Sequence, residues 1–233
     1  MKKRTNGIII AIDGPSGAGK STVARLLADR LGYLQVDTGA MYRAAALLIS
    51  RAGIDPADHS ALEEFCRKLD ISLKYNDGRQ TVIANGMDVT DQIRTPEMSL
   101  LTSRISSLKP VRDALLKSQR QMGNGGGVVL EGRDIGTVVF PDAELKFYLS
   151  ASAEERGRRR CEELSGNGEQ VTLKETIADV IKRDRQDSDR DIAPLRQAED
   201  AIAIDSSHLS VEDVIDRMVH LYREKINSTG TRL

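Results

Sequence analysis

Short apolar runs and amphipathic segments alternate along the first fifty residues. Residues 7–13, GIIIAID, form a β-branched run that ends at glycine and proline, which predicts a buried strand. Apolar residues then recur at helical spacing over 20–31, and Gly32 follows as a stop signal. A second short strand at 33–37 and a second helix at 39–52 come next. This strand–helix–strand–helix order predicts a βαβ unit and a parallel sheet.

The pattern changes after about residue 60. Over 71–89, three short strand-like runs are separated by the turn signals Asn-Asp-Gly at 76–78 and Asn-Gly at 85–86. This arrangement predicts a small antiparallel meander. Two helices are expected next, over 96–108 and 111–122.

The βαβ pattern returns after the three glycines at 125–127. Residue 165 begins a polar stretch, SGNGEQ, that separates two charged helices and resembles the tip of a mobile flap. We therefore expect one α/β core interrupted by an insertion at about 60–122. The remaining expected elements are strands at 128–132, 144–151 and 201–205, and helices from Ala153, from about Leu173, and over 211–225.

The composition favours a small-molecule ligand. A chain of 233 residues predicts one or two domains with a substantial core. Its 34 Lys and Arg balance 35 Asp and Glu, so the net charge of −1 gives no electrostatic reason to bind a polyanion. Aromatic residues make up only 3% and Trp is absent, which argues against base stacking. We expect no nucleic-acid partner.

Cysteine usage and hydropathy predict a location inside the cell. Cys66 and Cys161 lie far apart and outside any C-x-x-C pattern, as is usual in a reducing compartment. The apolar run at 8–12 is too short for a signal peptide or a membrane span. We expect a cytoplasmic protein with no membrane partner, and a monomer, since nothing requires assembly.

The stretch IDGPSGAGKST at 12–22 fits the pattern G-x-x-x-x-G-K-[ST] between a strand and a helix. In such a P-loop the backbone N–H groups face phosphates, Lys20 reaches the β- and γ-phosphates, and the Ser21 hydroxyl binds Mg²⁺. The sequence therefore predicts ATP binding with Mg²⁺. The predicted ATP-binding residues are Gly14, Pro15, Ser16, Gly17, Ala18, Gly19, Lys20, Ser21 and Thr22.

Other P-loop classes fit less well. The N-K-x-D motif that reads guanine in GTPases is absent. An ATP-driven motor needs an acidic strand end, for which Glu131 is the candidate, but Gly132-Arg133-Asp134 resembles substrate-binding chemistry instead. Phosphoryl transfer needs positioning and charge neutralisation, which arginines supply.

Four arginines stand at places where α/β sheets bind ligands, namely strand ends and the segment after the glycine-rich flap. They are Arg43, Arg133, Arg183 and Arg190. A charge run is ordinarily a solvated helix face, and we interpret residues 158–160 partly in that way.

Four motifs occur in the order IDGPSGAGKST, VDTGAMYR, LEGRDIGTVVFP and KRDRQDSDRDIAPL. Together they resemble bacterial cytidylate kinases, in the nucleoside-monophosphate (NMP) kinase family of P-loop kinases, and the resemblance extends from about residue 8 to 223. The resemblance implies an α/β, three-layer P-loop NMP-kinase fold with a parallel core sheet, a small antiparallel insertion and a helical lid. It implies a core of 1–59, 123–155 and 191–233, an NMP-binding region of 60–122 and a lid of 156–190.

The resemblance also implies roles for residues that match the family's motifs. Lys20, Arg133, Arg183 and Arg190 would be catalytic, and Arg43, Arg133 and Arg190 would hold the CMP phosphate. Ser103, Arg112 and Asp134 would read the cytosine edge, and Arg183 with Asp187 would contact the sugar or bridge towards ATP. Thr38 and Tyr42 would line the acceptor site.

Two positions depart from the family's usual residues. Thr38 replaces the common Ser, and Glu131 replaces Asp, which leaves its distance to Mg²⁺ or the ion's waters open by one methylene. Simpler alternatives are that Ser103 faces solvent and that Asp134 caps a helix or pairs with Arg133. The three histidines, His59, His208 and His220, fall outside the motifs and are expected at the surface.

The implied reaction is ATP + CMP → ADP + CDP, with dCMP as a second acceptor. It needs no general base. One alternative is a P-loop kinase for another acceptor, such as UMP, AMP or shikimate. A second alternative is a non-catalytic ATP-binding regulator that uses the insertion to dock a protein.

Overall fold

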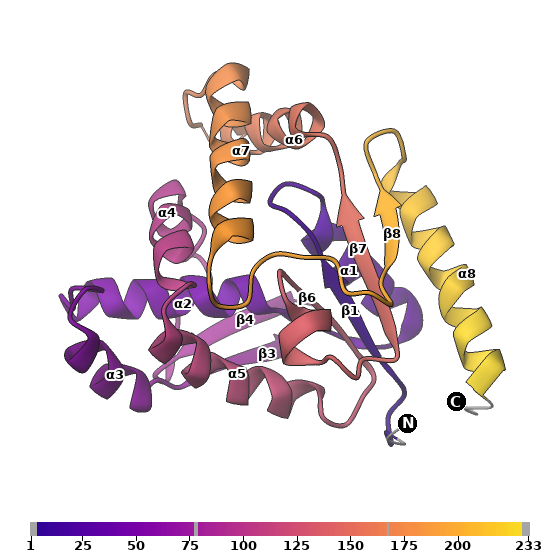
Figure 1. Cartoon of the computed structure of the whole chain (residues 1–233), viewed down its shortest axis with the longest axis horizontal. Helices are drawn as coiled ribbons and strands as arrows, with labels where there is room; N and C mark the ends of the chain where they lie inside the picture. The colour runs from indigo at the N-terminus through magenta and orange to yellow at the C-terminus, as the bar shows by residue number, and fades with distance from the viewer. Residues whose placement is uncertain (1–3, 77–78, 167, 230–233) are drawn as a thin grey trace. The chain divides into compact units, whose positions relative to one another are not determined.

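The computed structural model describes residues 4–76, 79–166 and 168–229 (Figure 1). The chain divides into two compact units. The first unit is Met1–Gln35 with Gly123–Leu233, and the second is Val36–Met122. The division into core, NMP-binding region and lid stays a prediction.

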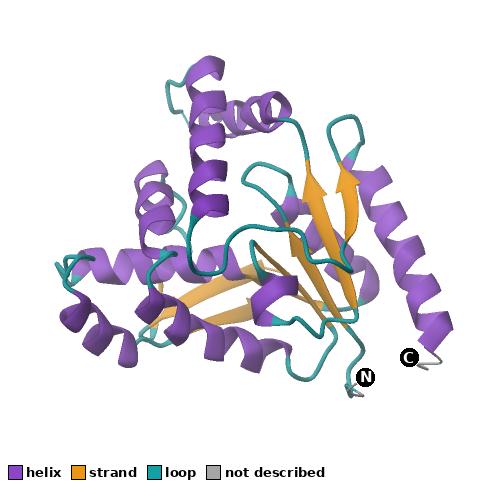
Figure 2. Ribbon diagram, in the orientation of Figure 1, coloured by secondary structure: helices purple, strands orange, loops and turns teal. Residues whose placement is uncertain are grey.

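The core sheet is parallel and has the strand order β2-β6-β1-β7-β8, and all of it but the last two residues of β2 belongs to the first unit. Figure 2 shows the strands in orange. β1 pairs in parallel with β6 and β7, and β7 pairs in parallel with β8. All five residues of β1 are buried, as expected for a central strand covered on both faces. The predicted parallel core is confirmed. Its strands are β1 (Ile9–Asp13), β2 (Leu34–Asp37), β6 (Val128–Gly132), β7 (Leu145–Ser150) and β8 (Ile202–Asp205).

Two helices share the sheet's hydrophobic core. Val23 and Leu27 of α1 lie in one cluster with Phe147 of β7 and with Ile215 and Met218 of α8. The described helices of this unit are α1 (Lys20–Leu31), α6 (Ala153–Gly166), α7 (Leu173–Asp189), α8 (Val211–Thr229) and the short π-helix η1 (Ile135–Val139). The sequence did not predict η1, because five residues without caps carry no helical periodicity.

The helices α6 and α7 pack closely against each other. A Cβ added to Gly157 of α6 would lie 2.4 Å from Cγ1 and 3.1 Å from Cα of Ile177 in α7. Thr172 and Glu175 form a reciprocal capping box at the start of α7. The predicted helical pair is therefore present. Asn167, in the predicted flap tip, lies outside the described residues.

The second unit contains the predicted insertion. Its antiparallel sheet has the order β3-β4-β5, and Asn85 and Gly86 both take positive φ at the turn between β4 and β5. The predicted meander is confirmed, although Asp77 and Gly78 of its first turn lie outside the described residues. The elements are α2 (Thr38–Arg51), α3 (His59–Arg67), β3 (Ile71–Asn76), β4 (Arg79–Ala84), β5 (Met87–Asp88), α4 (Pro96–Ile105) and α5 (Lys109–Gly123).

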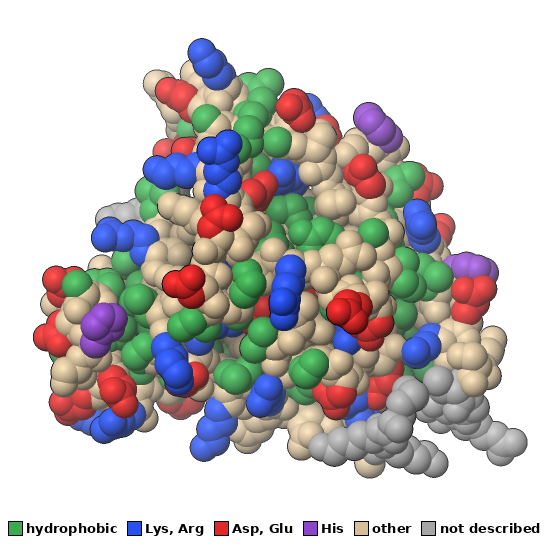
Figure 3. Space-filling view, viewed as in Figure 1, with side chains coloured by type: hydrophobic (Ala, Val, Ile, Leu, Met, Phe, Trp, Pro, Cys, Tyr) green, Lys and Arg blue, Asp and Glu red, His purple; other side chains and the backbone are tan. Residues whose placement is uncertain are grey.

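The surface agrees with several sequence-based expectations. The three histidines are exposed, and Cys66 and Cys161 are free thiols. Basic and acidic side chains are interspersed on the face that Figure 3 shows. Among the described residues, no helix combines the length and the hydrophobicity that a membrane crossing requires.

Candidate active site

The P-loop joins the end of β1 to the start of α1 and depends on glycine. Gly14 has φ +152°, and a Cβ there would lie 2.0 Å from the carbonyl oxygen of Leu149 in β7. Gly19, the N-cap residue of α1, has φ +86° and no side chain to cap the helix. The backbone N–H groups of the first turn of α1 are therefore available to an anion.

Lys20 places a positive charge at the same point. Its side chain is buried, and Nζ donates a hydrogen bond to the carbonyl oxygen of Pro15 over 2.6 Å. Burial, followed by the nearby positive charge of Arg133, lowers the pKa of Lys20 well below its usual value, although Glu131 and Asp187 act in the opposite direction. A buried ammonium next to another cation is strongly stabilised by an anionic ligand.

Ser21 and Glu131 supply oxygen atoms that suit a magnesium ion. Ser21 Oγ donates to Glu131 Oε2 over 2.7 Å, and Gln35 Nε2 donates to Glu131 Oε1 over 2.9 Å. A hydroxyl and a carboxylate are ligands that Mg²⁺ accepts, with the rest of its octahedral shell coming from phosphate and water. Among the described residues no group of three or more His, Cys, Asp or Glu could hold a metal.

The first unit also brings five of the predicted acceptor residues into one cluster. Arg133 Nε donates to Asp187 Oδ2 over 2.7 Å, and Arg190 Nη2 lies 4.0 Å from Asp134 Oδ1. Burial of Asp187 raises its pKa, but the charges of Arg133, Arg190 and Arg183 prevail and lower it. Asp187 is therefore ionised, and this cluster combines three arginines with two carboxylates.

Asp13, which the sequence did not single out, fixes the turn that follows Arg133 and Asp134. Its carboxylate accepts the backbone N–H groups of Ile135 and Gly136 over 2.8 and 2.7 Å. Burial raises the pKa of Asp13 to about 6, against the lowering effect of these two hydrogen bonds. No local sequence signal identifies this role, because the partners are more than 120 residues away along the chain.

In the second unit, Asp37 organises the start of α2. Its side chain accepts the N–H of Ala40 over 2.8 Å as an N-cap and pairs with Arg43 over 3.1 Å. Thr38, the first residue of α2, is buried. The sequence did not single out Asp37, although an Asp directly before a helix is a recognisable capping signal.

Arg112 is buried in the same unit among predicted acceptor residues. Its Nη1 donates to the carbonyl oxygen of Ser106 over 3.0 Å, and its Cζ lies 5.7 Å from the ring centroid of Tyr42. This is within cation–π range. Ser103 is half-buried on α4. The second unit therefore holds Arg112 and Tyr42 together.

Comparison with known proteins decides the family. The cytidylate kinase family model matches residues 10–224, which include all four motifs. The chain belongs to the cytidylate kinase family. It is 60% identical to the cytidylate kinase of Geobacter sulfurreducens over 96% of each chain, and 54% identical to that of Syntrophotalea carbinolica over 94% of this chain and 93% of the relative.

A solved structure resembles the fold alone. An uncharacterised protein from Eubacterium ventriosum is 13% identical, with a TM-score of 0.50 over 93% of this chain and 98% of its own. The family relationship predicted from the four motifs is thus confirmed by sequence, and the α/β fold class by the strand arrangement described above.

Proposed function

We propose that the protein transfers the γ-phosphoryl group of ATP to CMP, giving ADP and CDP, and that dCMP is a second acceptor. The observation that carries this proposal is the family match over residues 10–224. The buried, cation-flanked Lys20 in a complete P-loop supports it independently, because such a loop binds a nucleotide triphosphate.

On the donor side, the P-loop residues Gly14 to Thr22 would bind the ATP phosphates through backbone N–H groups. Lys20 would contact the β- and γ-phosphates and stabilise the negative charge during transfer. Ser21 and Glu131 would hold Mg²⁺ together with the nucleotide, the glutamate through water. The ion, when bound, neutralises charge on the phosphate oxygens.

On the acceptor side, Arg43, Arg133 and Arg190 would bind the phosphate of CMP. Arginine suits this task because its planar guanidinium makes bidentate hydrogen bonds to phosphate oxygens. The Asp187 carboxylate orients Arg133 by its 2.7 Å hydrogen bond. Arg183 and Asp187 would contact the sugar or bridge towards ATP.

The base would be read by Ser103, Arg112 and Asp134. Cytosine offers an exocyclic amine to a carboxylate and two acceptors to Arg and Ser donors. Uracil replaces the amine with a carbonyl, which sets acceptor against acceptor. A site with unpaired buried polar groups can reject such an analogue by about 10⁴-fold. Burial of Arg112 and Asp134 supports this role.

The test is a coupled assay of ADP release with ATP held fixed and CMP, dCMP, UMP, AMP and shikimate offered in turn. We expect fast release with CMP and dCMP, and loss of that release in Lys20→Ala. A preference for UMP, AMP or shikimate would identify a kinase for a different acceptor. Binding of ATP with no acceptor-dependent ADP release would instead favour the non-catalytic regulator.

A further inference from the structure

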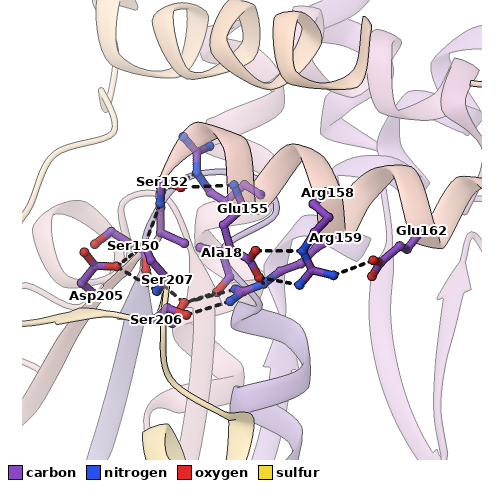
Figure 4. A network of polar contacts seen from close by, with 12 residues as sticks. Ala18, Ser150, Ser152, Glu155, Arg158, Arg159, Glu162, Asp205, Ser206 and Ser207 are labelled. Atoms are coloured by element: carbon purple, nitrogen blue, oxygen red, sulfur yellow. Dashed lines mark hydrogen bonds and ion pairs between the residues drawn. The ribbon is translucent and has the colours of Figure 1, made fainter. Parts of the chain in front are cut away.

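Arg159 of α6 makes a set of contacts that no charge-run pattern predicts. Its Nε donates to Glu155 Oε1 over 2.8 Å, its Nη1 to Ser206 Oγ over 3.2 Å and its Nη2 to the carbonyl oxygen of Ser206 over 2.7 Å. Figure 4 shows the guanidinium extending from α6 onto the segment that follows β8. The Arg159 side chain thus joins α6 to this segment through hydrogen bonds to the hydroxyl and to the carbonyl oxygen of Ser206.

Ser206 is in turn attached to the P-loop region. It is buried, its N–H donates to the carbonyl oxygen of Ser150 over 2.8 Å, and its Oγ lies 3.0 Å from that same oxygen. The carbonyl oxygen of Ala18 in the P-loop lies 3.5 Å from Oγ. The Nη1 atom of Arg159 would stand only 3.7 Å from a Cβ added to Gly19. The network therefore reaches the residues directly before α1.

The neighbouring residues of the segment are fixed as well (Figure 4). The N–H and Oγ of Ser207 both donate to Asp205 Oδ1, over 2.9 and 2.6 Å. Ser207 Oγ accepts the N–H of Ser152, at the entrance to α6, over 2.9 Å. We call residues 205–207 the β8 loop. Its conformation is set by contacts to β7, to α6 and to the P-loop region.

The β8 loop lies where a nucleotide's outer part belongs. In α/β sheets, ligands bind at the carboxyl ends of parallel strands, and the P-loop and the β8 loop follow two such ends, those of β1 and β8. A triphosphate on the N-terminus of α1 occupies the P-loop itself. Its nucleoside must extend beyond the P-loop, and the β8 loop adjoins the P-loop at Ala18 through Ser206.

We propose that Arg159 and Ser206 are positioning residues for the donor nucleotide, holding the β8 loop against the P-loop as a preformed wall for its nucleoside. The inference rests on the proposed function only in taking ATP as the donor. Preorganisation raises affinity because the loop need not be ordered upon binding. Loss of the contacts between Arg159 and Ser206 should therefore weaken ATP binding and leave CMP binding largely unchanged.

Arg158 provides a matched control on the same helix. It is half-exposed, and its guanidinium pairs only with residues of α6 among the contacts described, namely Glu155 and Glu162. Arg158→Gln and Arg159→Gln therefore remove the same charge, and each removes hydrogen bonding to Glu155, two bonds in the first variant and one in the second. They differ in the contacts to Ser206.

The experiment measures the Kd for ATP by calorimetry, and the KM values for ATP and CMP, in the wild type, Arg158→Gln, Arg159→Gln, Ser206→Ala and the double variant Arg159→Gln/Ser206→Ala. We expect Arg159→Gln to raise the Kd and KM for ATP about tenfold, the size of a lost charge-assisted hydrogen bond. The KM for CMP should change less than about twofold, and Arg158→Gln should match the wild type. Since Arg159 and Ser206 act as a unit, the double variant should resemble Arg159→Gln instead of multiplying the two effects.

The inference is overturned if Arg159→Gln and Arg158→Gln have the same Kd for ATP, or if the KM values for ATP and CMP rise together. Should Arg159→Gln fail to fold, Ser206→Ala alone supplies the same comparison. Failure of the proposed function is a separate result, in which the wild type does not phosphorylate CMP. The Kd for ATP would still report on the role of Arg159 and Ser206.

Discussion

Gly14 offers a sharp test of the P-loop geometry. The change Gly14→Ala adds a methyl group at a residue with φ +152°, where the new Cβ would lie 2.0 Å from the carbonyl oxygen of Leu149. Ordinary contacts begin at 3.4 Å, so the loop and β7 must separate by 3.4 − 2.0 = 1.4 Å. The matched control is Gly32→Ala, at φ +66°, where a Cβ meets nothing within 4 Å.

Both variants place an alanine in an unfavourable backbone conformation, but only Gly14→Ala also creates a steric clash. Backbone strain costs about 1–3 kcal/mol, and overpacking against a fixed neighbour adds about 1–3 kcal/mol. We therefore expect Gly14→Ala to lower the free energy of unfolding by about 2–6 kcal/mol and Gly32→Ala by about 1–3 kcal/mol. A displacement of this size at the phosphate site should also reduce kcat/KM for ATP by about 100-fold, which Gly32→Ala should not.

Urea denaturation gives the two free energies, and the coupled ADP assay gives the rates. The reasoning fails if the two variants lose the same stability, because both glycines have positive φ but only a Cβ at Gly14 meets the Leu149 carbonyl. It also fails if Gly14→Ala keeps the kcat/KM of the wild type.

Three other predictions concern separate parts of the molecule. The pKa of Asp13 is raised to about 6, above the ordinary 3.8, so its contribution to stability is complete below pH 3.8 and is lost as the pH rises through 6. The free energy of unfolding of the wild type minus that of Asp13→Asn should therefore fall by about 3 kcal/mol between about pH 3 and about pH 7 in urea titrations, and a flat difference would contradict the burial argument. Gly157→Ala should destabilise the α6–α7 pair by about 1–3 kcal/mol in thermal unfolding, because the new methyl group contacts Ile177. The control Gly166→Ala, with open space around it, should be neutral or stabilising, and equal effects of the two variants would show that the helices are not in close contact. Arg112→Met should reduce the ratio of kcat/KM for CMP to that for UMP at least about tenfold, with the KM for ATP unchanged, and an equal loss with both acceptors would remove Arg112 from base recognition.

Much of the fold follows from local patterns in the sequence. The β-branched run before the P-loop, the helical spacing in α1 and the turn signals at 85–86 each report on a few neighbouring residues, and the corresponding elements were predicted close to their observed bounds. The π-helix η1 was not predicted because five residues carry no helical periodicity, and because the N–H groups of Ile135 and Gly136 donate to the carboxylate of Asp13 in a distant strand.

Some residues of the candidate site could likewise be predicted from local patterns, and others could not. Lys20 and Ser21 were predictable because the P-loop pattern is local and specific. Arg159 was interpreted as part of a solvated helix face, an interpretation that fits Arg158 with its partners on α6. It does not fit Arg159, because Ser206 is 47 residues distant in sequence and only the fold brings them together. Asp37 was within reach of sequence reasoning, since its capping position is a local signal.

The central claim is that this protein moves a phosphoryl group from ATP to CMP. The most direct measurement is to incubate the protein and Mg²⁺ with CMP and ATP labelled at the γ-phosphate, and to separate the nucleotides. We predict that the label appears in CDP, at a rate that Lys20→Ala abolishes. Label that appears only in inorganic phosphate, or that stays in ATP, would contradict the account.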